Sequence, residues 1–257
     1  MASPLDGPHD SAPGSSSDGS AVGDRRRAVR PVWQELLLLL AVALVLAVLI
    51  KAFFLQAFYI PSASMSDTLV KNDRILVQKV SYWTGGPSRG DVVVFSDPGG
   101  WLDASESAAS GGPVVQGLEA VGLYPTGGHL VKRVIGVGGD EVRCCDRDGR
   151  ITVNGVPLQE GSYLAPGQRP SLVRFDVRVE RGHLWVQGDN RSDSADSRAH
   201  LGDPGGGQVP ARDVVGKVFV LLWPHSRFHV LHRPADFAGI PAPSSTTSRS
   251  GSSRGGQ

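Results

Sequence analysis

Three segments of the sequence carry side chains of the types that nucleophilic catalysis requires. Ser64 lies in the hexapeptide Ile-Pro-Ser-Ala-Ser-Met at 60–65, Lys132 lies among apolar residues at 130–136, and a polar cluster occupies 188–198. A serine hydroxyl attacks a carbonyl only when a base removes its proton. A lysine can be that base if burial lowers its pKa from about 10.4 by roughly 2 to 4 units. The first hypothesis is therefore a hydrolase that uses a serine and a neutral lysine.

The neighbours of Lys132 can supply that burial if residues 130–137 form a strand. Leu130 and Val134 would then share the face of Lys132, whereas Arg133 would point the other way, toward water. The alternative is that Lys132 is a solvated strand lysine, and its neighbours alone do not decide between the two.

Histidine is the usual base for a catalytic serine, and the chain has seven histidines. None of them lies in a Gly-x-Ser-x-Gly motif or beside an evident aspartate partner motif. A Ser/His/Asp site is therefore disfavoured.

The element before Ser64 has the composition of a membrane anchor. Leu36 to Ile50 is an unbroken apolar run, and aromatic residues extend it at both ends, namely Trp33, Phe53, Phe54, Phe58 and Tyr59. Together they approach the roughly 20 residues that a bilayer requires. The basic residues upstream predict a cytoplasmic N-terminus by the positive-inside rule; they are Arg25, Arg26, Arg27 and Arg30. A cleavable secretory signal and a buried core helix are the competing interpretations, and the long polar leader and the apolar character of every face count against them.

Beyond residue 60 the pattern favours a mainly β domain. Apolar and β-branched runs bounded by glycine predict about seven or eight strands, at 74–80, 91–95, 130–137, 151–156, 171–179, 183–187 and 214–222. Asn154-Gly155 between two of these runs predicts a hairpin with a type I′ turn. Helical periodicity is weak here, so we expect an antiparallel sheet.

Composition limits the remaining possibilities. The net charge of +1 gives no global basic field for nucleic acid. The only two cysteines, Cys144 and Cys145, lack the second Cys/His pair of a metal site, so no metal is expected. A disulfide between them and two small core residues both remain open. No cofactor motif is present, and no cofactor is expected.

Four segments resemble, in order, the conserved boxes of bacterial type I signal peptidases, also called leader peptidases, and most of all the actinobacterial form. The segments are 60–65, 90–95, 131–136 with Gly139-Asp140, and 188–191 followed by 194–198. The resemblance implies a signal-peptidase-like antiparallel β domain with a small variable β lobe, preceded by one transmembrane α-helix. The expected organisation is a disordered cytoplasmic leader (1–30), the anchor (31–56), an extracytoplasmic peptidase domain (57–233, with the small lobe at 141–181) and a disordered tail (234–257).

The resemblance also implies a role for each candidate residue. Ser64 would be the nucleophile and Lys132 the general base, which later protonates the leaving amine. Ser62 would complete the oxyanion hole with the Ser64 backbone N–H, and Ser194 would orient the Lys132 amine. Structural support would come from ion pairs and backbone contacts of Asp189, Arg191, Asp196 and Arg198.

The function implied is that of a membrane-bound serine endopeptidase that removes N-terminal signal peptides from exported preproteins after small residues, at Ala-x-Ala type sites. The partners implied are preprotein signal peptides and the lipid bilayer, with the secretion translocon as an open addition, and no nucleic acid. The location implied is the cell membrane, with a single span. Two alternatives remain: another Ser/Lys self-cleaving peptidase, and a non-catalytic membrane-anchored β domain that binds exported chains.

Overall fold

The computed structural model describes residues 31–79, 82, 85–102 and 128–243, and for residues 48–54 it describes the backbone alone. The predicted leader at 1–30 and the end of the predicted tail at 244–257 lie outside these ranges.

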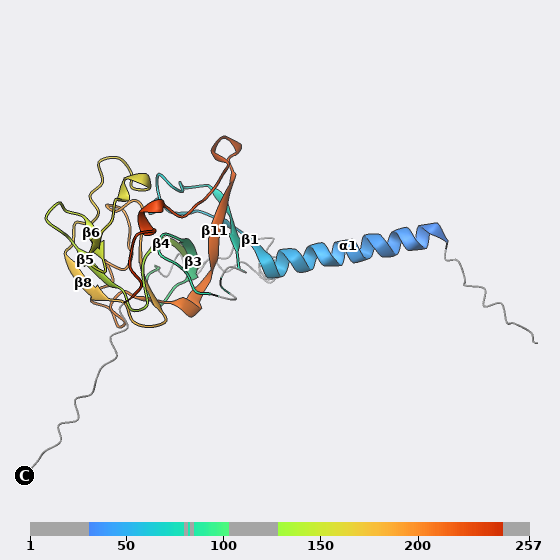
Figure 1. Cartoon of the computed structure of the whole chain (residues 1–257). Coiled ribbons are helices and arrows are strands. Elements are labelled where there is room, and N and C mark those ends of the chain that lie inside the picture. The colour runs from blue at the N-terminus through green and yellow to red at the C-terminus, as the bar shows by residue number, and fades with distance from the viewer. Residues whose placement is uncertain (1–30, 80–81, 83–84, 103–127, 244–257) are drawn as a thin grey trace, which may run out of the picture. The chain divides into compact units, whose positions relative to one another are not determined.

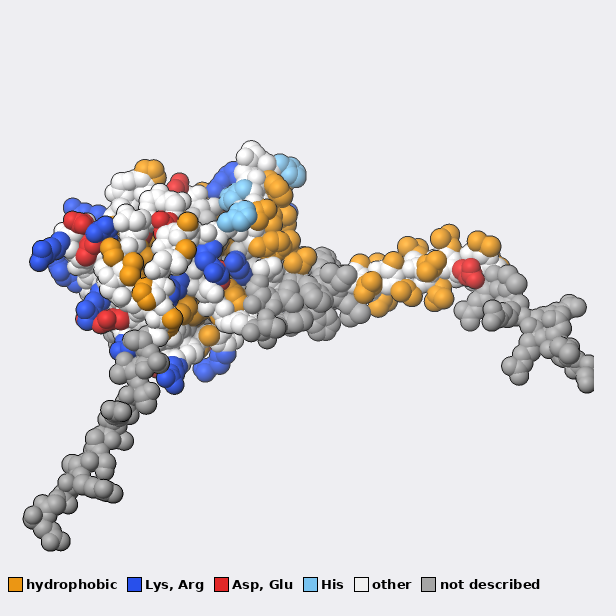
Figure 2. Space-filling view, in the orientation of Figure 1, with side chains coloured by type: hydrophobic (Ala, Val, Ile, Leu, Met, Phe, Trp, Pro, Cys, Tyr) orange, Lys and Arg blue, Asp and Glu red, His pale blue; other side chains and the backbone are white. Residues whose placement is uncertain are grey.

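The first described element is a long helix, α1, over Val32–Phe54. Its leucine- and alanine-rich sequence favours the helical state, and Glu35 in the first turn suits the positive end of the helix dipole. Apolar side chains on several faces of the helix are exposed, among them Leu36, Leu38 and Leu39 (Figure 2). Within the described part of the chain, no helix has both the length and the apolar character that crossing a membrane demands.

A large antiparallel sheet carries the candidate residues. Among the described residues it contains eight strands, in the order β1-β2-β11-β3-β4-β9-β10, with β12 paired to β11. The strands are β1 (Leu55–Tyr59), β2 (Arg74–Gln78), β3 (Val92–Ser96), β4 (His129–Val137), β9 (His183–Gln187), β10 (Val209–Pro210), β11 (Val214–Trp223) and β12 (His229–Val230). The order places strands that are distant in sequence side by side, such as β11 between β2 and β3 (Figure 1). The expectation of a mainly antiparallel β fold is confirmed.

A second sheet lies within residues 141–178. It has the order β7-β6-β5-β8, formed by β5 (Glu141–Cys144), β6 (Ile151–Val153), β7 (Val156–Pro157) and β8 (Phe175–Arg178). The predicted hairpin joins β6 to β7, and Asn154 and Gly155 both have positive φ, of 52° and 79°. This is the left-handed pair of a type I′ turn.

Apolar residues on both faces of the large sheet are buried. Trp185 on β9 and Ile135 on β4 pack with the second sheet, whereas Val134 and Val186 pack on the opposite side with Phe95. Because both faces of β4 and β9 are covered, polar residues on these strands are buried as well.

The helix predicted for the anchor at 31–56 extends two residues beyond the helix that is observed. The helix stops at Phe54, and Leu55–Tyr59 pairs with β2 as strand β1. Phe58 and Ile60 alternate into the core at 5% and 2% exposure, so Phe58 belongs to the β domain and is not an aromatic end of the anchor.

The predicted boundary of the disordered tail, residue 234, lies too early in the sequence, because residues after it are ordered and buried. Phe237 and Ile240 are buried at 5% and 8% exposure, and Phe237 stacks on Tyr163 with ring centroids 5.8 Å apart. Arg89 donates to the carbonyl oxygens of Ile240 and Pro241. Two large apolar side chains are enough to fix a segment that is otherwise rich in Ala, Gly and Pro.

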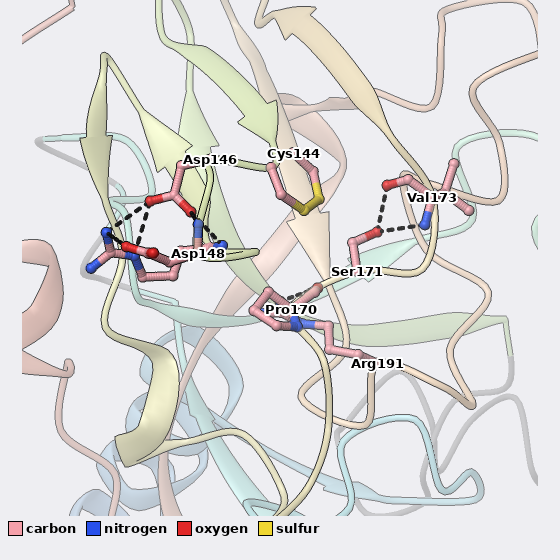
Figure 3. The surroundings of a disulfide bond; sticks show 9 residues. Cys144, Asp146, Asp148, Pro170, Ser171, Val173 and Arg191 are labelled. Carbon is pink, nitrogen blue, oxygen red and sulfur yellow. Dashed lines mark hydrogen bonds and ion pairs between the residues drawn. A yellow bond between two sulfur atoms is a disulfide. The ribbon is translucent and has the colours of Figure 1, made fainter.

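Cys144 and Cys145, at the end of β5, are joined by a disulfide (Figure 3). Asp146 follows them and accepts hydrogen bonds from the backbone and the guanidinium of Arg150, which closes the adjacent turn. The disulfide is one of the two states that the sequence left open.

Candidate active site

The turn that follows β1 holds Ser64 in a fixed backbone. Ile60 N–H donates to Asp73 O at 2.9 Å, which joins the two ends of the turn. Met65 and Leu69 point into the core at 1% and 0% exposure. Their burial fixes the turn, and it leaves the Ser64 side chain at the edge of the core, 7% exposed.

Lys132 on β4 reaches this serine. Its Nζ donates a hydrogen bond to Ser64 Oγ at 2.6 Å, although the two residues lie 68 positions apart in the sequence. Lys132 is 3% exposed, so the interpretation of a solvated strand lysine is wrong. When the amine is neutral, the same contact lets its lone pair accept the Ser64 proton.

The surroundings of Lys132 favour the neutral amine. Burial lowers the pKa of Lys132 from 10.5 to about 8, because the charged form loses its hydration. The carboxylates of Asp196 and Asp189 oppose this effect by raising the pKa. The net result is a base that is available near neutral to weakly alkaline pH.

Ser62 lies on the solvent side of Ser64. Its hydroxyl oxygen is 3.3 Å from Ser64 Oγ, and either oxygen can be the donor. Ser62 is exposed, whereas Ser64 is buried. This position is compatible with the oxyanion role expected for Ser62.

Ser194 does not make the contact expected of it. Its Oγ is buried and forms no hydrogen bond with any group in the described part of the chain, Lys132 included. The hydroxyl nevertheless lies near enough to Asp196 to make a small contribution to lowering the pKa of that carboxyl. It also packs against Gly188, where a Cβ would lie only 2.3 Å from Ser194 Oγ and 2.4 Å from Ser64 O. Gly188 is therefore required for the close approach of this loop to the nucleophile.

The four residues expected to give structural support all form buried ion pairs. Asp196 pairs with Arg198 at 2.7 Å, Arg191 pairs with Glu160 at 2.6 Å, and Asp189 pairs with Arg133 at 2.6 Å. Burial alone would raise the pKa of Asp196, but the Arg198 guanidinium and the Gly188 N–H together outweigh it, and the pKa is lowered. Asp196 also accepts the Gly188 N–H at 3.0 Å, so this carboxylate shapes the loop beside Ser64.

The expectation that Arg133 points to water is wrong. Arg133 is 3% exposed, donates to both carboxylate oxygens of Asp189 and to Gly90 O, and lies 4.4 Å from the centroid of the Tyr163 ring. Arg133 and Lys132 do point to opposite faces of β4, as expected, but the face of Arg133 is covered by Tyr163 and its neighbours. A charge on that face is buried and must be paired.

Sequence reasoning missed several residues that hold the site together. Thr68 donates to Asp189 Oδ2 at 2.6 Å, and Asn190 donates through its backbone and its side chain to the carbonyls of Ser64 and Ala63. Asn190 and Arg133 both lie inside the motifs that carry the resemblance, so their place in those motifs could have identified them as site residues. Glu160 had no such signal, because it lies in a short 3-10 helix, Glu160–Ser162, outside every motif.

No group of three His, Cys, Asp or Glu side chains lies close enough to hold a metal ion in the described part of the chain.

A serine held against a buried lysine on an antiparallel β domain is the arrangement of a Ser/Lys hydrolase. Comparisons with known proteins are consistent with this class. Residues 33–223 match the family model described as signal peptidase, peptidase S26. The chain therefore belongs to the signal peptidase family, peptidase S26.

Curated relatives cover most of the chain. Signal peptidase I of Mycobacterium tuberculosis is 38% identical over 87% of this chain and 85% of its own length. A probable signal peptidase I of Mycobacterium leprae is 37% identical, over 81% of this chain and 82% of its own length. Probable signal peptidase I-2 of a Synechocystis species is 35% identical over 79% of both chains.

Proposed function

We propose that this chain is a serine endopeptidase that removes N-terminal signal peptides from exported preproteins, with Ser64 and Lys132 as its catalytic pair. The observation that carries the proposal is the 2.6 Å contact between Lys132 Nζ and Ser64 Oγ, made by a buried lysine whose pKa is lowered to about 8. Membership of the signal peptidase family supports the choice of substrate.

The chemistry follows from these atoms. Neutral Lys132 takes the Ser64 proton as Oγ attacks the scissile carbonyl, and the protonated amine then gives that proton to the leaving amine. The resulting acyl-enzyme is cleaved when Lys132 deprotonates a water molecule. Ser62 Oγ, which lies 3.3 Å from Ser64 Oγ, and the Ser64 N–H would donate to the oxyanion that forms in both steps.

We also propose that the apolar N-terminal segment, of whose residues 48–54 only the backbone is described, anchors the enzyme in the membrane, with the N-terminus cytoplasmic and the β domain outside. The apolar run of the sequence, the exposed leucines of α1 and the arginines before it support this proposal. An anchor raises the effective concentration of enzyme and signal peptide, because both lie in the same bilayer.

The catalytic pair is tested with full-length protein in detergent and a preprotein that carries an Ala-x-Ala site. Wild type should release the mature chain, whereas Ser64→Ala and Lys132→Ala should each lower the rate at least about 10³-fold. Ser66→Ala is the matched control, since it removes a hydroxyl from the same turn but not from the catalytic pair. Equal cutting by wild type and either active-site variant would sink the assignment.

The rate should also depend on pH through Lys132. Below a pKa of about 8 the amine is protonated and cannot accept the Ser64 proton, so activity should rise with pH and level off above that value. Asp193 is exposed and raises the pKa of Lys132, so Asp193→Asn should move the midpoint to lower pH. The measurement is kcat against pH for both proteins. A maximum at acidic pH would point to carboxylate chemistry instead.

A further inference from the structure

The Ser64 N–H can stabilise an oxyanion only if its peptide group is held in one orientation. In a trans peptide the C=O and the N–H point in opposite directions across a planar unit. The oxygen of that unit belongs to Ala63, so whatever binds Ala63 O also aims the Ser64 N–H.

Two donors hold Ala63 O. One is the Ser66 backbone N–H, at 2.9 Å, which is local to the turn. The other is Asn190 Nδ2, at 3.1 Å, which reaches across from the loop after β9. The Asn190 backbone N–H also donates to Ser64 O at 3.1 Å. Asn190 therefore holds the peptide groups on both sides of the nucleophile.

The orientation of the Asn190 amide is itself fixed, by Gln168. Gln168 Nε2 donates to Asn190 Oδ1 at 2.8 Å and to Ser192 Oγ at 2.9 Å, while Gln168 Oε1 accepts the Ser192 N–H at 3.0 Å. Because Gln168 must present its oxygen to that N–H, its nitrogen faces Asn190 Oδ1. Asn190 Nδ2 is then the end that faces Ala63 O.

We propose that Asn190 is a positioning residue for the oxyanion hole and that Gln168 holds it in place. The inference rests on the proposed function and deepens it. Asn190 acts through the Ala63–Ser64 peptide: it fixes the direction of the Ser64 N–H, and by binding the carbonyl it strengthens that N–H as a donor. The loop that contains Gln168, between residues 163 and 174, thereby controls a group on the nucleophile turn.

Asn190→Ala isolates this contact, because the backbone bond from residue 190 to Ser64 O is kept. We expect kcat to fall about 10- to 100-fold, since removal of an oxyanion donor costs about 10²- to 10³-fold and here the donor is misaligned rather than lost. KM for a peptide with an Ala-x-Ala site should change less than about 3-fold, because the ground state gains little from the oxyanion hole. The midpoint of the pH profile should stay where it is in wild type, because Lys132 is untouched.

Asn154→Ala is the matched control. Asn154 Nδ2 also donates to a backbone carbonyl at 3.1 Å, that of Pro241, and to Asp140, but it lies in the hairpin of the second sheet. Asn154→Ala should lower Tm at least as much as Asn190→Ala, because Asn154 also has a left-handed φ of 52°. Its kcat should remain that of wild type, which separates a loss of stability from a loss of alignment.

A second pair of variants tests the part played by Gln168. Gln168→Leu should lower kcat in the same direction as Asn190→Ala, and the double variant should be no worse than Asn190→Ala alone, because both act through one contact. Gln208→Leu is its control, since Gln208 also bridges two loops, through Glu180 N–H and Arg178 O.

The outcomes separate this inference from the function on which it rests. Wild-type kcat in Asn190→Ala, a rise in KM alone, or a shifted pH midpoint would each overturn the positioning role while leaving the peptidase assignment intact. An inactive wild type, or Ser64→Ala as active as wild type, would overturn both.

Discussion

Replacing Lys132 by methionine is expected to abolish cleavage and, at about pH 7, to raise the free energy of unfolding by about 2 kcal/mol. The pKa of Lys132 falls from 10.5 to about 8 on folding, so burying the charged amine costs about 3 kcal/mol. Loss of the hydrogen bond to Ser64 offsets about 1 kcal/mol of that gain. The catalytic base thus lowers stability in return for reactivity.

The sign of the pH dependence follows from the direction of the shift. Between the folded pKa of about 8 and the unfolded value of 10.5, the unfolded chain binds more protons than the folded one. The stability of wild type therefore rises with pH across this window. The advantage of Lys132→Met should be complete below pH 8 and should fade as the pH approaches 10.5.

Urea unfolding of full-length protein at about pH 7 and about pH 10 measures both effects. Lys71→Met is the matched control, since Lys71 is exposed and its removal should change stability by less than about 0.5 kcal/mol. If Lys132→Met is less stable than wild type at both pH values, the lysine is not a buried charge that opposes folding.

The strands could be predicted from the sequence because they depend on local signals, whereas Ser64 and Lys132 were singled out by the motifs that carry the resemblance. The β-branched runs predicted β3, β4 and β9, and the Asn154-Gly155 pair predicted the β6–β7 turn. Strand β1 was missed because Phe58 follows a long apolar run, and in sequence it is indistinguishable from the end of that run.

The remaining errors share one physical cause, which is burial by segments distant in sequence. Arg133 alternates outward from Lys132 as predicted, yet Tyr163 covers that face. Phe237 looked like part of a polar tail, yet it fills the core beside the second sheet. The alternation of side chains along a strand shows which of them share a face, but it does not show whether another layer covers that face.

Removing the negative charge of Asp189, which pairs with Arg133, is expected to lower both stability and activity strongly. Asp189 is 0% exposed, accepts two hydrogen bonds from Arg133, and accepts a third from Thr68 on the nucleophile turn. It therefore joins β4, the Ser64 turn and the loop after β9. Asp189→Asn leaves the buried guanidinium without its counter-charge, which should cost about 3 to 5 kcal/mol of unfolding free energy and most of the activity.

A double variant separates the charge from the positioning. Arg133→Met with Asp189→Leu removes both charges, and because apolar pairs often replace buried ion pairs without loss, much of the stability lost in Asp189→Asn should return. Activity should not return, since Thr68 loses its acceptor and the nucleophile turn loses its tie to the loop after β9.

Asp176→Asn is the matched control, because Asp176 pairs with Arg143 at the surface, where solvent screens the pair, and Tm should stay unchanged. Activity restored together with stability would show that Asp189 supports only the fold, whereas activity that stays low in a stable protein would identify Asp189 as the residue that aligns Lys132 with Ser64.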